Sequence, residues 1–67
     1  MLTKQEIKLA RKSKWFDVMQ QMKLDGHYDT AAKVRRQIEY LKLYKPRQNK
    51  KILALTYLLE CEFGEKL

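Results

Sequence analysis

The sequence predicts an all-α domain of three helices, in which an antiparallel helical hairpin precedes a hydrophobic third helix. Apolar residues recur at steps of three and four through most of the 67-residue chain, as they do on one face of a helix. Turn-forming residues cluster at two places, Leu24-Asp25-Gly26-His27 and Lys45-Pro46-Arg47-Gln48-Asn49. The length suits a single domain over residues 1–67, and no linker separates two parts.

The first helix is expected to begin after Thr3, because Thr3 and Glu6 have the spacing of a capping box. Its later turns carry an apolar face made by Trp15, Val18, Met19 and Met22. On the same side, its earlier turns carry Lys4, Lys8, Arg11 and Lys12. We interpret the pattern as one continuous helix whose first turns extend past the core as a basic strip. The alternative is a break near Lys12-Ser13.

The second helix is predicted over about residues 29–44, with Asp29 as its N-cap. One narrow apolar stripe consists of Ala31, Val34, Ile38 and Leu41. A second apolar group lies nearly opposite and consists of Ala32, Tyr40 and Leu43, with Arg36 among them. A helix with two apolar sides is expected to touch two neighbours, or one neighbour and one partner molecule.

The third helix is predicted over about residues 48–63, where apolar side chains surround almost the whole cylinder. A strand over residues 52–58 is the alternative, but the length and the Ala and Leu content favour a helix. Such a pattern is typical of a central buried helix, and a domain this small has little surface with which to cover it. We therefore expect a homodimer through this helix, with Tyr57 and Cys61 on the extra face.

The formal net charge of +7 is unevenly distributed. Residues 1–14 hold five basic residues and one acidic residue, and residues 33–51 hold eight basic residues and one acidic residue. Residues 15–32 and 52–67 each hold one basic residue and three acidic residues. The positive charge thus forms two blocks, and the larger block brackets the only proline, Pro46.

Cations interleaved with tyrosines suit a nucleic-acid backbone, because the cations release counterions when they meet phosphates and the rings stack on unpaired bases. The N-terminus of the third helix adds backbone amides that can hold a phosphate. The sequence therefore predicts a small protein that binds DNA or RNA. The predicted contacts are Lys4, Lys8, Arg11, Lys12, Lys33, Arg35, Arg36, Tyr40, Lys42, Tyr44, Lys45, Arg47, Lys50 and Lys51.

The sequence predicts no catalytic site, no metal site, no cofactor and no small-molecule substrate. His27 is the only histidine and lies in a turn, where exposure or capping explains it better than general-base catalysis. Cys61 lies between two glutamates, which disfavour a reactive thiolate, and is interpreted as a packing residue. Asp25 and Asp29 flank the same turn and are expected to cap helices. We therefore do not expect an enzyme.

The single cysteine excludes an internal disulfide, which favours a reducing compartment. Residues 1–6 lack the apolar run of a secretory signal, and the apolar stretch over residues 52–59 is far too short to span a membrane. We therefore expect a cytoplasmic location and no membrane partner. Peripheral membrane binding through the first helix is disfavoured because its basic and apolar residues share one face.

An aromatic residue followed by a pair of alanines, an arginine and spaced aliphatic residues occurs as Tyr28, Ala31-Ala32, Arg35, Ile38 and Leu41, with Met22 before them. In this pattern residues 19–41 resemble the UVR motif, a helical hairpin of bacterial excision-repair proteins and some protease adaptors. The chain departs from the motif at Gly26-His27, where aliphatic turn residues are usual, and at Arg36, where an acidic residue is usual. A tetratricopeptide-type helix pair would fit Gly26-x-Tyr28 equally well. The resemblance implies a hairpin that docks onto another protein or hairpin.

The excess of apolar surface and this resemblance leave a second function open. In this alternative, the chain is an adaptor or inhibitor that binds an acidic protein. Phages and other small genomes encode proteins of this kind that act on a host enzyme.

Overall fold

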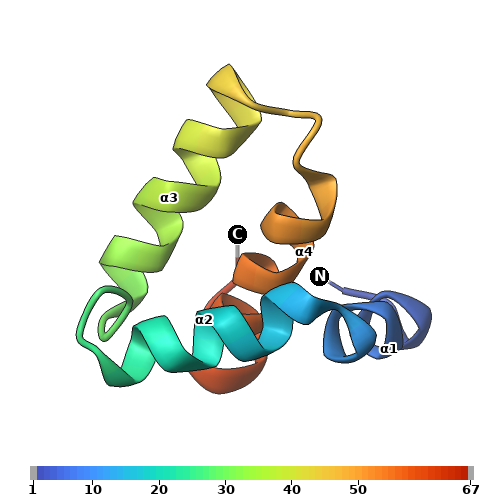
Figure 1. Ribbon diagram of the computed structural model, residues 1–67, viewed down its shortest axis with the longest axis horizontal. Coiled ribbons are helices and arrows are strands. Elements are labelled where there is room, and N and C mark those ends of the chain that lie inside the picture. Colours follow the sequence, from blue (N-terminus) through green and yellow to red (C-terminus); the bar gives the residue numbers. More distant parts are fainter. Residues whose placement is uncertain (1, 67) are drawn as a thin grey trace.

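The computed structural model describes residues 2–66, which form four α-helices and a final π-helical turn (Figure 1). The elements are α1 (Lys4–Lys12), α2 (Lys14–Leu24), α3 (Ala31–Tyr44), α4 (Asn49–Tyr57) and η1 (Leu58–Glu62). No strand occurs within this described stretch. The all-α class is confirmed. The expected count of three helices is wrong because the first predicted helix is two helices.

The break between α1 and α2 lies at Ser13, whose backbone is extended, with φ −72° and ψ 143°. The Ser13 hydroxyl oxygen accepts a hydrogen bond from the backbone N–H of Trp15 over 3.2 Å and so caps α2. The interpretation as one continuous helix is therefore corrected, and the alternative break is the observed one. The physical reason is that a serine satisfies a free N–H at a helix start better than it supports a helix interior.

The helices α1 and α3 each begin at a threonine cap, whereas α4 begins after Gln48 without a side-chain cap. The predicted capping box is confirmed, since the Thr3 N–H donates to Glu6 Oε1 over 3.0 Å and the Glu6 N–H donates to Thr3 Oγ1 over 3.2 Å. The predicted cap at Asp29 is wrong, because Thr30 Oγ1 accepts from the Lys33 N–H over 3.3 Å and caps α3. Asp29 instead pairs with the side chain of Lys33.

The helix α4 is the centre of the molecule and contacts α1, α2 and α3 (Figure 1). Each residue from 54 to 59 is buried, and Leu55, Leu58 and Leu59 are at most 1% exposed. Met19 from α2 and Ile38 and Leu41 from α3 complete the core around them. The predicted central buried helix is therefore confirmed. The other helices of the same chain cover residues 54–59, whereas Ile52 and Leu53 are only partly buried.

The helices α2 and α3 meet at their connecting turn and diverge from it, and each packs on α4 (Figure 1). Gly26, with φ of 87°, allows the left-handed backbone that this turn requires. The expected antiparallel packing of the hairpin along its length is therefore corrected. The two helices diverge because α4 and η1 occupy the space in which α2 and α3 would otherwise contact each other.

Candidate nucleic-acid interface

Seven cations lie on neighbouring parts of the fold, namely the end of α3, the α3–α4 connection (top of Figure 1), the first turn of α4 and the bend between α1 and α2, and we call them the basic end. Three of them, Lys12, Lys14 and Lys50, line one groove between the bend and α4. Among residues 2–66, no member of the set forms an ion pair with a carboxylate. The basic end consists of Lys12, Lys14, Lys42, Lys45, Arg47, Lys50 and Lys51.

Two predicted contact residues lie instead at the beginning of α3 and are held by acidic neighbours. The Lys33 ammonium contacts Asp29 Oδ1 at 2.7 Å and donates to the carbonyl oxygen of Gly26 at 3.2 Å. The Arg35 guanidinium donates to Glu65 Oε2 at 3.1 Å and to the carbonyl oxygen of Lys66 at 3.0 Å. Because α3 has 14 residues and rises about 1.5 Å per residue, these two cations lie far along the helix from the basic end.

The outward face of α3 carries three more of the predicted contacts, Arg36, Tyr40 and Tyr44, all exposed. The Tyr40 and Tyr44 ring centroids lie 5.1 Å apart, with the rings tilted by 46°. Leu43, between them on the same face, is 75% exposed. This face is opposite the buried residues of α3, so its rings can meet a ligand without any change in the core.

The predicted basic strip on α1 is present for three of its four residues. Lys4, Lys8 and Lys12 line one shallow depression on that helix. Arg11 turns away from them toward α4, where its Nε donates to the Tyr57 hydroxyl over 3.0 Å. This hydrogen bond raises the pKa of the Arg11 guanidinium, which therefore stays charged.

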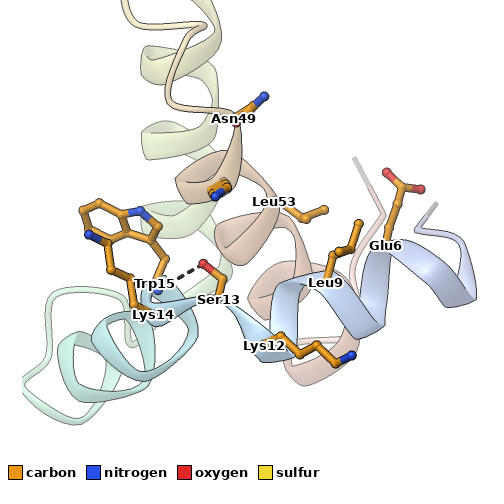
Figure 2. Close-up of a pocket in the computed structure, with 9 residues that line it drawn as sticks. Glu6, Leu9, Lys12, Ser13, Lys14, Trp15, Asn49 and Leu53 are labelled. Atoms are coloured by element: carbon orange, nitrogen blue, oxygen red, sulfur yellow. Dashed lines mark hydrogen bonds between the residues drawn. The ribbon is translucent and has the colours of Figure 1, made fainter.

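The groove at the basic end has a volume of about 740 Å³ and is open to solvent (Figure 2). We call it the Trp15 groove, after the aromatic residue at one end of its lining. The Lys51 and Lys14 amines lie 5.2 Å and 6.0 Å from the Trp15 ring centroid. Its lining residues are Glu6, Leu9, Lys12, Ser13, Lys14, Trp15, Asn49, Lys50 and Leu53.

Trp15 was not among the predicted contacts, because its spacing placed it on the apolar face toward the core. It does pack against the core in part, but its side chain is only partly buried. The sequence signal that would have found it is the adjacent Lys14. The contact of Lys51 with the Trp15 ring depends on the packing of α4 against α2, so no residue near either position in the sequence predicts it. Cation–π contacts of this exposed kind contribute about 0.5–1 kcal/mol each, so a ligand can displace them.

The two residues predicted for a dimer interface have different surroundings. Tyr57 is 6% exposed, and its ring meets Phe16 edge-on with centroids 5.4 Å apart, so the chain itself covers this side chain. Cys61 is exposed on η1. Association of two chains stays a prediction.

Within residues 2–66, no group of three or more His, Cys, Asp and Glu side chains is placed to hold a metal ion. In the same stretch, none of the helices has both the length and the apolar character needed to cross a membrane. We find no match to this chain among family models, curated proteins or solved structures.

Proposed function

We propose that this protein is a non-enzymatic binding protein whose basic end contacts the phosphate backbone of nucleic acid. The observation that supports the proposal is a separation of charge along the fold. The cations of the basic end have no carboxylate partner within the described residues, whereas Lys23, Lys33 and Arg35 form ion pairs at the other end of α3. Unpaired cations gathered on one surface are the electrostatic feature that binds phosphates and releases their counterions.

The aromatic side chains beside these cations add a second kind of contact. Tyr40 is 47% exposed and Tyr44 is 70% exposed, next to the cations of the α3–α4 connection. Exposed rings of this kind stack on bases without reading their sequence, and phosphate contacts are equally independent of sequence. The proposal is therefore binding with little sequence preference. A cytoplasmic location belongs to the same proposal and is supported by the lone thiol of Cys61.

A titration of labelled duplex DNA, single-stranded DNA and structured RNA over a range of salt concentrations tests the proposal. Binding should weaken steeply as salt rises. The informative variant combines Lys45→Gln, Arg47→Gln and Lys50→Gln. Its plot of log affinity against log salt should be less steep by roughly 2, because each lost phosphate contact removes about 0.7–0.9 from the slope.

The matched control combines Lys23→Gln, Lys33→Gln and Lys66→Gln, which changes the net charge equally at the other end of the molecule. Thermal unfolding of both variants confirms that each is folded at the assay temperature. The control should retain most of the salt dependence. Absence of binding at low salt, or equal loss in the two variants, would contradict the proposal.

A second candidate function, an adaptor or inhibitor that binds an acidic protein, is supported by the outward face of α3. Leu43 and Tyr44 are 75% and 70% exposed, and adjacent apolar residues on one helix face suit insertion into a groove of a partner. The same face could join two copies of the chain into the expected homo-oligomer. Capture from bacterial lysate with and without nuclease separates the two functions. A stoichiometric protein that survives nuclease and is lost with Leu43→Glu would favour the adaptor.

A further inference from the structure

The Trp15 groove has the size of a site for a small ligand. It lies where the bend between α1 and α2 faces the first turn of α4 (Figure 2). Its volume of about 740 Å³ falls inside the range of roughly 300–1,000 Å³ that is usual for small-ligand sites. Trp15 lines one end of it beside Lys14, and Leu9 and Leu53 supply apolar side chains toward the other end (Figure 2). Leu9 remains 56% exposed there, so this part of the groove is open to a ligand.

The charged groups around the groove are arranged for a ligand that carries phosphate. Lys12, Lys14 and Lys50 line it, and the Lys51 amine lies over the indole ring. The one carboxylate in the lining belongs to Glu6, at the opposite end from Trp15 (Figure 2). That carboxylate accepts a hydrogen bond from the Thr3 N–H over 3.0 Å, which is part of its helix cap. The Trp15 end of the groove is therefore both aromatic and cationic.

We propose that the Trp15 groove holds an unpaired base of a single-stranded nucleic acid, which makes single strands the preferred ligand of this protein. The inference rests on the proposed function and names the class of nucleic acid that the function leaves open. The base stacks on the Trp15 indole, and the flanking phosphates meet the lysine amines. Asn49 offers a side-chain amide, a donor and an acceptor, to the edge of the base.

The lysine side chains are free to move off the Trp15 ring when a base takes their place. The Lys14 and Lys51 amines lie 6.0 Å and 5.2 Å from the ring centroid, and each is attached through a flexible four-carbon chain. When a base takes the ring face, the same amines reach the phosphates on either side of it. A duplex cannot make this contact because its bases are paired and stacked, so their faces are closed to a side chain.

Trp15 is the only tryptophan of the chain, so its fluorescence reports on the groove directly. The experiment titrates the protein at low salt with an oligonucleotide of about 16 nucleotides, with the duplex of the same sequence, and with a nucleoside monophosphate. We expect the single strand to quench the fluorescence and to bind at least about tenfold more tightly than the duplex. The nucleoside monophosphate should bind much more weakly than the strand, because it lacks the flanking phosphates.

The matched variants place one glutamate at an exposed leucine inside or outside the groove. Leu9→Glu puts a carboxylate in the groove and should lower single-strand affinity by at least about tenfold. Leu24, which is 80% exposed at the end of α2, lies outside the groove, so Leu24→Glu should have little effect. Both positions are exposed, and circular dichroism verifies that both variants are folded. In Leu9→Glu the duplex affinity should fall less than the single-strand affinity, because the duplex meets the new carboxylate at the basic end but has no stacked base to lose.

The outcomes separate this inference from the proposed function. If single strands and duplexes bind equally and the fluorescence does not change, the inference is overturned while the proposed function stands. If the monophosphate binds as tightly as the strand, the groove is a site for free nucleotides and the inference is again overturned. If no nucleic acid binds at low salt, the proposed function fails, and the inference fails with it.

Discussion

The guanidinium of Arg11 and the phenol of Tyr57 join the first helix to the end of the central one. Arg11 Nε donates to Tyr57 Oη over 3.0 Å, and the guanidinium carbon lies 5.6 Å from the centroid of the same ring. Phe16 from α2 meets that ring from another direction. Three helices therefore meet at one tyrosine, and a cation that the sequence assigned to a ligand surface serves the fold.

Tyr57→Phe should lower the Tm by about 4–8 °C. The substitution keeps the ring and its contact with Phe16 but removes the acceptor for Arg11. Loss of one hydrogen bond lowers the Tm of a domain of this size by that amount. Thermal unfolding followed by circular dichroism measures the change. Tyr44→Phe is the matched control, since Tyr44 is 70% exposed and its hydroxyl has no hydrogen-bond partner within residues 2–66. Equal Tm values for the two variants would contradict the role of the Arg11 contact.

Ser13→Ala should destabilise the protein by about 1 kcal/mol, because alanine cannot accept the hydrogen bond from the Trp15 N–H that begins α2. Ser13→Asp should retain the stability, since aspartate caps a helix as well as serine does. The aspartate also places a carboxylate in the Trp15 groove, so it should weaken nucleic-acid binding while the fold is kept. Urea unfolding and a binding titration on both variants measure these two effects. A Ser13→Ala protein as stable as the parent would contradict a stabilising role for this cap.

Leu55→Ala should destabilise the protein by about 2–5 kcal/mol, which is enough to unfold most of a domain this small. Leu55 is 0% exposed in the centre of α4, so its truncation leaves a cavity among α2, α3 and α4. The matched substitution Leu43→Ala removes the same atoms from a side chain that is 75% exposed. It should change stability by no more than about 0.5 kcal/mol. Denaturant titrations that place both variants at the same midpoint would refute the central position of α4.

Acid should destabilise the protein through two carboxylates. Hydrogen bonds from the backbone and side chain of Thr3 lower the pKa of Glu6 below its ordinary value of 4.5. The hydrogen bond from Lys33 lowers the pKa of Asp29 below its ordinary value of 3.8. Because both pKa values are lower in the folded chain, their stabilising effect is present above the ordinary values and is lost as the pH falls through the folded ones.

The Tm, measured from neutral pH down to pH 3, should therefore decrease once the pH is below about 4.5. The double variant Glu6→Gln and Asp29→Asn should start from a lower Tm and lose less of it on acidification. Glu39→Gln is the control, since Glu39 has no hydrogen-bond or ion-pair partner within the described part of the chain. A double variant that loses as much Tm as the parent would assign the acid sensitivity to other groups.

The helices could be predicted where the deciding chemistry is local. The Thr3 and Glu6 pair fixes the first cap, and the unbroken apolar residues of α4 indicate a helix that others surround. The bend at Ser13 was only the second interpretation, because the basic residues before it and the apolar residues after it fall on one side of a single continuous helix. A serine between two lysines has a weak local signal, and the choice depends on whether the hydroxyl finds the Trp15 N–H.

The candidate site was less predictable because its side chains meet partners from distant positions. Arg35 and Glu65 are 30 residues apart, and Arg11 and Tyr57 are 46 residues apart. Nothing near either arginine in the sequence distinguishes it from a cation that faces solvent. Trp15 shows the converse, since a residue that periodicity assigns to the core also lines a groove.

The position of α4 in the chain has a consequence for synthesis. The helix on which α1, α2 and α3 all pack is the last of the four to leave the ribosome. Until residues 54–59 emerge, Met19, Ile38 and Leu41 have no core to enter and remain in contact with water. The native fold therefore forms only after translation has passed α4, and the nascent helices before it depend on that last segment for protection from aggregation and proteolysis.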